Sequence, residues 1–259
     1  METLVFYSYK GGVGRSSLLA NAARYLVSLG KGVVALDFDL EAPGLHYRLG
    51  REGLEAGPER LGGVVPYLLA TAQGASSPPR FEEHMVEVPA GSSGGWLRLI
   101  PAGPAPDRVY WTALKQLGED VHFDDPSGEG LMPLLDLHAR IKEELHPDYL
   151  LIDARSGVTE LGGLATTILA DTVVCLFTAD PESLDGTLTV LEALKSAPRL
   201  TGQRPVRIVP LLARKASEPY AGGVERLLAL CAGGMREPLV LPEGEAQEAY
   251  LELFQGLFP

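Results

Sequence analysis

Cysteine and histidine are scarce in this chain of 259 residues, which contains two of the former and five of the latter. Two cysteines cannot build a disulfide framework, and we expect Cys175, which stands in an apolar run, to lie in the core. The histidines at positions 46, 84, 122, 138 and 146 lack the spacing typical of zinc ligands. The sequence therefore favours neither a disulfide-stabilised small fold nor a structural or catalytic zinc site.

Basic residues are also few, because 22 Lys and Arg face 34 Asp and Glu, for a net charge of −12. Phosphate neutralisation along a nucleic acid needs clustered cations, so nucleic-acid binding is not expected. We interpret the scattered cations of the C-terminal half as solvated surface on separate elements: Arg199, Arg204, Arg207, Arg214 and Lys215.

Long hydrophobic runs are missing, and no apolar stretch approaches the roughly 20 residues that a membrane-spanning helix needs. No signal-peptide pattern precedes the first apolar segment, so we expect a cytoplasmic protein. Hydrophobic residues nevertheless make up 46% of the chain, enough for one large α/β domain with a sizeable core.

Glycine is abundant, and three glycines fall within the four positions 11 to 14. The apolar run Val5–Tyr9 before them is typical of a buried strand, and Ser16-Ser17 after them suits the start of a helix. Strand, glycine loop and helix form the context of a phosphate-binding loop, in which backbone N–H groups and the helix dipole meet an anion. The simpler interpretation is a glycine-rich turn without a ligand, but two nearby cations, Lys10 and Arg15, favour phosphate.

The segment Lys10-Gly11-Gly12-Val13-Gly14 closely resembles the deviant P-loop of the ParA/MinD family of ATPases. This resemblance implies ATP and Mg²⁺ as ligands, and a nucleotide-sandwich dimer in which Lys10 reaches the partner subunit's phosphates. It further implies that Arg15 and the backbone amides of this loop hold the phosphates, while Ser16 binds Mg²⁺. The predicted phosphate loop comprises Lys10, Gly11, Gly12, Val13, Gly14, Arg15, Ser16 and Ser17.

Two positions of this loop depart from the family pattern. Tyr9 stands where many P-loops begin with glycine, and Arg15 replaces the P-loop lysine. A guanidinium keeps the positive charge but is wider than an ammonium and cannot act as the same point donor. Phosphate binding is therefore expected, whereas the rate of hydrolysis is left open by the sequence.

Two acids follow the apolar run Val33–Leu36, which is typical of a parallel strand buried on both faces. Ligands of open α/β sheets bind beyond the carboxyl ends of the strands, so Asp37 and Asp39 are expected near the phosphates. The family resemblance implies that Asp39 orients the attacking water and that Asp37 supports the Mg²⁺ shell. The alternative is that this pair only caps the end of a strand.

A second apolar strand, Tyr149–Ile152, ends in Asp153, which matches the Walker B pattern of a carboxylate that orders Mg²⁺ or its water. Gly157 occupies a switch position where its N–H could sense the γ-phosphate. Much of the family has two prolines before this glycine, and Arg155 and Ser156 replace them here. Arg155 is interpreted either as a further phosphate contact or as half of a surface ion pair.

The base-binding side is less clear in the sequence. Family members bind the purine through the loops after the last strands, which implies Arg214 and Pro242 here. The stretch Leu212-Ala213-Arg214-Lys215 lacks the polar residue that often precedes the arginine, so the choice between ATP and GTP stays open.

We predict an α/β, three-layer P-loop NTPase fold with a mostly parallel sheet, formed by a single domain over residues 1–259. Residues 50–130 are interpreted as Gly/Pro-rich insertions with helices near 61–71 and 107–117 and a strand at 96–100. The tail helix expected at 245–258 carries acids, so it should pack on the domain instead of binding anionic lipid. Further helices are expected at 16–29, 131–145, 161–170 and 181–196, and further strands at 171–178 and 206–212.

The expected function is a Mg-dependent, slowly hydrolysing ATP switch that dimerises face to face on nucleotide and acts on an unidentified protein partner. Its catalytic residues would be Asp39, Lys10 and Arg15. The alternative is a regulatory nucleotide-binding module with little or no turnover, because of Arg15. A metabolic ligase or a protein kinase of the same P-loop class shares the fold, and the absence of a tyrosine-rich tail disfavours the kinase.

Overall fold

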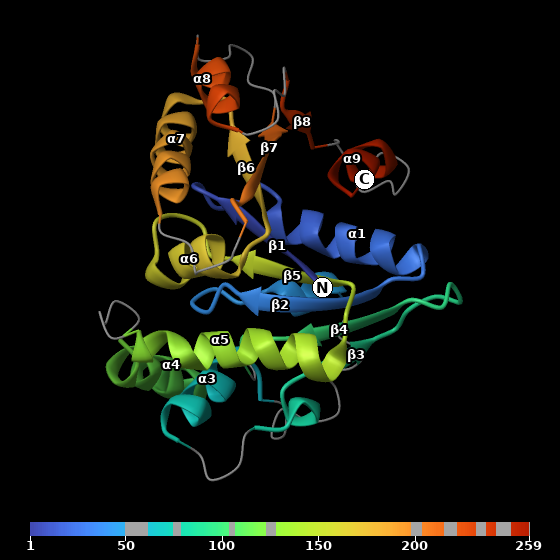
Figure 1. Ribbon diagram of the computed structural model, residues 1–259, viewed down its shortest axis with the longest axis vertical. Coiled ribbons are helices and arrows are strands. Elements are labelled where there is room, and N and C mark those ends of the chain that lie inside the picture. Colours follow the sequence, from blue (N-terminus) through green and yellow to red (C-terminus); the bar gives the residue numbers. More distant parts are fainter. Residues whose placement is uncertain are drawn as a thin grey trace. The chain divides into compact units, whose positions relative to one another are not determined.

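The computed structural model describes residues 1–49, 62–74, 79–103, 107–122, 128–197, 204–214, 222–231, 237–241 and 250–258 (Figure 1). Its internal contacts divide the chain into two compact units. The first unit comprises residues 1–2 and 26–153, and the second comprises residues 3–25 and 154–259.

Among its described residues, the first unit contains four strands in the order β3-β4-β2-β5. They are β2 (Gly32–Phe38), β3 (Val86–Val88), β4 (Trp96–Ile100) and β5 (Tyr149–Ala154). β2 and β4 pair in parallel, whereas β3 runs antiparallel to β4. Every residue of β2 is buried, as expected of a strand covered on both faces. The strand predicted at 96–100 is thus confirmed, and it belongs to the sheet.

Helices of the first unit lie mainly on one side of β2 and β4, where α3, α4 and α5 are seen in Figure 1. They are α2 (Leu45–Leu49), α3 (Val64–Ala72), α4 (Arg108–Asp120) and α5 (Met132–Arg140). The side chain of Asp107 caps α4 by accepting from the N–H of Tyr110, which explains why that helix begins where the sequence predicts. Short 3₁₀ turns cover Phe81–Glu83 and Glu129–Leu131.

The second unit has the strand order β1-β6-β7-β8. Its strands are β1 (Glu2–Ser8), β6 (Thr172–Thr178), β7 (Arg207–Arg214) and β8 (Leu239–Val240), and neighbouring strands pair in parallel. Val5 of β1 lies opposite Val173 of β6. Cys175 on β6 is fully buried, which confirms its predicted place in the core.

The helices of this unit are α1 (Arg15–Ser28), α6 (Glu160–Leu164), α7 (Pro181–Ser196), α8 (Gly223–Leu230) and α9 (Leu251–Leu257). A π-helical turn, η5 (Ala165–Leu169), continues α6. On α9, the ring of Phe254 lies 5.1 Å from that of Tyr25 on α1, and the carbonyl of Leu257 accepts a 2.9 Å hydrogen bond from Arg207. The described part of the tail therefore packs on its own domain, as predicted.

The predicted α/β architecture with a mostly parallel sheet flanked by helices is confirmed. Differences concern element ends and short elements. The helix expected at 131–145 is a 3₁₀ turn, α5 and a π-helical turn, η4 (Ile141–Leu145), in succession. The short α2 and β3 were not predicted, and residues 245–249 of the expected tail helix lie outside the described residues. Among the described helices, none combines the length and apolar character that a membrane span requires.

Candidate nucleotide-binding site

The glycine loop between β1 and α1 has the conformation that the sequence predicts. β1 ends at Ser8 and α1 begins at Arg15. Gly12 and Gly14 have φ angles of 74° and 91°, in the left-handed region where a residue with a Cβ would be strained. The loop thus leads directly into a helix N-terminus, where backbone N–H groups and the helix dipole favour an anion.

Exposure differs along this loop. Gly11 and Gly12 are exposed, whereas Val13, Ser16 and Ser17 are half-buried. Arg15, at the position of the P-loop lysine, retains only 8% of its accessible surface. The backbone at the tip is therefore open to a ligand, while the side chain of Arg15, which replaces the P-loop lysine, is almost covered.

Leu241 covers the other side of the loop. A Cβ built on Gly14 would lie 3.2 Å from a methyl carbon of Leu241, so that side chain rests against the glycine. Leu241 directly follows β8, which pairs with β7 at Leu212 and Val240. Pro242, predicted to contact the base, lies outside the described residues. The strand end that leads to it is thus placed beside the phosphate loop.

Lys10 is held by two carboxylates at the start of α7. Its Nζ lies 2.8 Å from Asp180 Oδ1 and 2.8 Å from Glu182 Oε2, and these hydrogen bonds raise the pKa of the ammonium. Asp180 also caps α7 by accepting from the N–H of Ser183. Although burial by itself would raise it, the hydrogen bonds from Lys10, Thr178 and Ser183 bring the pKa of Asp180 to about 2. Lys10 is therefore an ammonium paired within its own chain.

Gly157 is fixed to β1 by two hydrogen bonds. Its N–H donates to the carbonyl of Ser8 at 3.1 Å, and its carbonyl accepts from the hydroxyl of Tyr7 at 3.1 Å. Its φ of 81° is a conformation that suits glycine. Burial raises the pKa of Tyr7, so its hydroxyl stays a donor. The predicted switch glycine thus lies next to the phosphate loop, with its N–H bonded to Ser8.

Tyr9 fits against α7 at a glycine. A Cβ on Gly186 would lie only 2.3 Å from the Tyr9 ring, so this close approach requires a residue without a side chain. The residue that replaces the first P-loop glycine is therefore a packing contact between the loop and α7.

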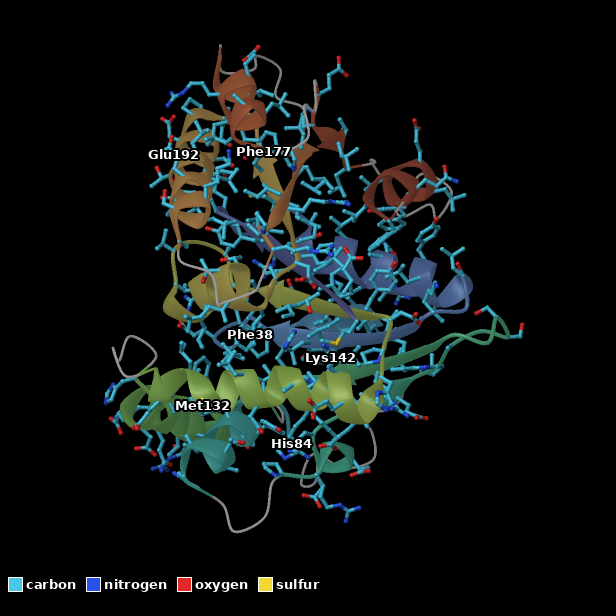
Figure 2. All side chains as sticks on the ribbon, viewed as in Figure 1. Phe38, His84, Met132, Lys142, Phe177 and Glu192 are labelled. Atoms are coloured by element: carbon cyan, nitrogen blue, oxygen red, sulfur yellow. The ribbon has the colours of Figure 1, made fainter. Side chains whose placement is uncertain are left out.

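In the first unit, Asp37 is completely buried at the end of β2 and organises the segment that follows. One of its oxygens accepts from the N–H of Asp39 at 3.3 Å, and the other accepts from the N–H groups of Gly44 and Leu45 at 3.1 and 3.0 Å. Phe38, labelled in Figure 2, separates the two acids and points into the core, being 1% exposed. The segment 39–45 is thus folded around one carboxylate.

Asp153 ends β5 in the same unit and is 1% exposed. Burial and the nearby charge of Asp153 raise the pKa of Asp37 to about 7, although three backbone N–H groups act in the opposite direction. Two buried carboxylates that repel each other are the arrangement a hard divalent cation stabilises. Among the described residues, no group of three or more His, Cys, Asp and Glu side chains is set to hold a metal alone.

Asp39 is half-buried on this segment. The next residue, Leu40, accepts a 2.5 Å hydrogen bond at its carbonyl from the hydroxyl of Tyr110 on α4. That contact was not predicted, since nothing in the local pattern around Tyr110 indicates a partner 70 residues away.

The two arginines that the sequence associates with the nucleotide lie in the second unit. Arg155 is half-buried, and Arg214 is the last residue of β7, with its side chain outside the described part.

Solved structures share this fold. MinD from Pyrococcus horikoshii OT3, a septum site-determining protein complexed with Mg-ADP, is 19% identical with a TM-score of 0.59, covering 97% of this chain and 85% of that one. McdA from Cyanothece in complex with ATP is 21% identical with a TM-score of 0.59, covering 100% and 90%. A ParA family ATPase from Chlorobium tepidum TLS is 19% identical with a TM-score of 0.57, covering 98% and 88%.

A comparison with curated proteins finds no match. The profile of one domain family, the CobQ/CobB/MinD/ParA nucleotide binding domain, matches residues 4–243. This range begins within β1, includes the glycine loop and both predicted carboxylate strands, and ends just after β8. The chain therefore belongs to the CobQ/CobB/MinD/ParA family of nucleotide-binding domains.

Proposed function

We propose that this protein is a Mg-dependent ATP-binding switch that hydrolyses ATP slowly, dimerises face to face on nucleotide and acts on a protein partner. The observation that supports this most directly is the glycine loop, with Gly12 and Gly14 in the left-handed region and α1 starting at Arg15. Together with family membership over residues 4–243, it favours a nucleoside triphosphate over other anions.

In this mechanism the exposed backbone of Gly11 and Gly12 and the first turn of α1 bind the β- and γ-phosphates. Arg15 adds a positive charge from a nearly covered position. Preorganised donors of this kind act on charge that develops in the transition state, without reorganising at that moment. Asp39 orients the attacking water, and Gly157 senses the γ-phosphate after its N–H leaves Ser8.

The proposal assigns the magnesium ion to three oxygen-bearing residues. Ser16 offers a hydroxyl, and the acids Asp37 and Asp153 offer buried carboxylate oxygens, which are the ligands Mg²⁺ prefers. The raised pKa of Asp37 supports this, because a cation would favour its ionised form. When bound, the ion would neutralise charge on the phosphates.

Dimerisation would bring Lys10 of one subunit to the phosphates of the other. Its present partners are exposed, with 41% of the Asp180 side chain and 74% of the Glu182 side chain accessible. Exposed ion pairs contribute little stability. Lys10 can therefore exchange these carboxylates for phosphate oxygens when a partner subunit supplies them.

The test is phosphate release with Mg-ATP, combined with light scattering to record mass with and without ATP. Slow turnover and an ATP-dependent dimer are expected. The proposal fails if neither nucleotide binding nor a change of mass is observed.

A regulatory module with little turnover is the second candidate, and the buried Arg15 favours it. A guanidinium at 8% exposure has little freedom to follow the transferred phosphate as an ammonium would. An ATP-dependent dimer without phosphate release would support this candidate. Gain of turnover in Arg15→Lys would show that the native loop is tuned against hydrolysis.

A further inference from the structure

A cavity of about 270 Å³ lies within the second unit, beside the switch glycine. Its walls come from Tyr7 on β1, from segment 157–159, from α6 with the π-helical turn η5, and from one face of α7. Among the described residues that line it, none is charged. It is therefore distinct in chemistry from the phosphate loop.

The threonines around this cavity present little polarity, because their hydroxyls are bonded to nearby backbone. Thr166 and Thr167 donate to carbonyls of α6, including that of Gly163 at 2.9 and 2.7 Å. Thr189 donates to the carbonyl of Asp185 at 2.9 Å, and Thr159 accepts from the N–H of Gly162 at 3.1 Å. With these groups satisfied, the walls offer mainly methyl groups, and an uncharged apolar ligand loses no hydrogen bond on entering.

The volume of the cavity and the backbone around it also suit a small apolar ligand. A 150 Å³ apolar cavity is large enough for benzene, so about 270 Å³ has room for a fused pair of small rings. At the lining residue Gly163, an added Cβ would meet no atom within 4 Å, although glycine destabilises a helix relative to alanine. A π-helical turn such as η5 is often found at functional sites. Gly163 and the π-helical turn η5 therefore leave room for the cavity, although neither favours a stable α-helix.

The hydrogen bond from the Tyr7 hydroxyl to the carbonyl of Gly157 borders this cavity, since both residues line it. Val158, the next residue, is 79% exposed. A ligand in the cavity would lie beside this bond, and would resist the movement of Gly157 away from Ser8.

We propose that this cavity binds a small, uncharged, apolar molecule of one or two rings, and that binding holds Gly157 on β1. The first part stands on the cavity alone. The second part, that the ligand opposes the response to ATP, rests on the proposed function. The protein would then carry a regulatory site for an apolar metabolite behind its switch glycine.

Indole is the probe for the test, titrated into the nucleotide-free full chain and followed by saturation-transfer NMR. Thr189→Leu places a larger apolar side chain in the cavity wall. Thr112→Leu on α4 is the matched control, because Thr112 is also exposed and donates to a carbonyl four residues earlier at 2.8 Å. We expect saturable indole binding by the wild type and the control, and at least about tenfold weaker binding by Thr189→Leu. Absence of binding, or equal binding by both variants, would overturn the site.

The effect of the ligand on Gly157 is measured separately. Hydrogen exchange at the Gly157 amide should slow at least about fivefold with saturating indole, and Tyr7→Phe should remove most of that protection. Indole should also weaken ATP-driven dimerisation. Unchanged exchange or unchanged dimerisation would sink the regulatory role. If indole binds as expected but ATP does not bind at all, the proposed function fails while the apolar site stands.

Discussion

Lys10 and Asp180 are joined by a 2.8 Å hydrogen bond between ammonium and carboxylate, although 170 residues separate them in the chain. Asp180 is also the N-terminal cap of α7. The lysine at the mouth of the phosphate loop is thus fastened to the first turn of a helix in its own subunit. A residue expected to act on another subunit must first leave this position.

Removing the charges that hold Lys10 should therefore promote nucleotide-driven dimerisation. In the double variant Asp180→Asn and Glu182→Gln, the helix cap is kept because asparagine caps as well as aspartate. We expect about two- to fivefold tighter dimerisation with ATP, the modest gain that exposed ion pairs allow. Light scattering over a range of protein concentrations measures it.

The matched control changes two other acids of α7, Asp185→Asn and Glu192→Gln. Both are exposed, and Glu192 is seen on the outer side of the helix in Figure 2. This control also removes two negative charges, but it leaves the contacts of Lys10 unchanged. Equal gains in both double variants would mean that net charge, and not the Lys10 contacts, sets the equilibrium.

Asp39→Ala tests the assignment of the residue that orients water. Loss of a positioned proton acceptor costs about 10²- to 10⁴-fold in rate. We expect phosphate release to fall by at least about 100-fold while ATP affinity stays within about threefold. Turnover that survives in the variant would remove Asp39 from the mechanism.

Tyr110→Phe should loosen the segment after β2. The variant deletes a buried hydroxyl and leaves the carbonyl of Leu40 without this donor, a loss of about 1–3 kcal/mol in unfolding free energy. Faster hydrogen exchange at the amides of Gly44 and Leu45 is expected, together with slower ATP turnover. Tyr149→Phe, a half-buried tyrosine on β5, is the control and should leave exchange in that segment unchanged.

Gly186→Ala should disturb the phosphate loop through Tyr9. The added methyl would lie 2.3 Å from the ring, so the ring or the helix must move, at a cost of about 1–3 kcal/mol. Gly118→Ala on α4 makes the same chemical change where a Cβ meets no neighbour, and should stabilise by up to about 1 kcal/mol. Urea unfolding and ATP titration of both variants provide the measurement, and similar behaviour of the pair would contradict the packing argument.

His84 should make the stability depend on pH. Burial lowers its pKa, so below the ordinary value near 6.5 the unfolded chain binds more protons than the folded protein. The contribution of the buried, neutral His84 to the free energy of unfolding is therefore complete above about pH 6.5 and is lost as the pH falls. Urea unfolding at pH 7.5 and 5.5 should show a smaller difference for His84→Gln than for the wild type, whereas His122→Gln, an exposed histidine, should keep the full difference.

Much of the fold was predictable because its signals are local. The run around Val33 and the glycines at 12 and 14 each specify a buried strand or a left-handed turn from neighbouring residues alone. Helix α7 was predicted at its observed bounds, since Pro181 suits the first turn of a helix. The fold class followed from the alternation of such elements.

Contacts between distant segments were not predictable in the same way. The partners of Lys10, the bond between Tyr7 and Gly157 and the bond between Tyr110 and Leu40 join residues 70 or more positions apart. No local pattern encodes such a pair, because it depends on which strands become neighbours. Only the fold shows that Asp180 receives the ammonium of Lys10.

The pairing of β1 with β6 has a consequence for synthesis. Val5 lies opposite Val173, so the strand that precedes the phosphate loop cannot gain this neighbour until residue 173 has left the ribosome. At about 5–20 residues per second, that takes on the order of ten to thirty seconds. During this interval an apolar strand and a glycine loop are present in the nascent chain without this neighbour. A ribosome-bound chain should therefore acquire its affinity for nucleotide late and in one step, rather than when the loop itself is made.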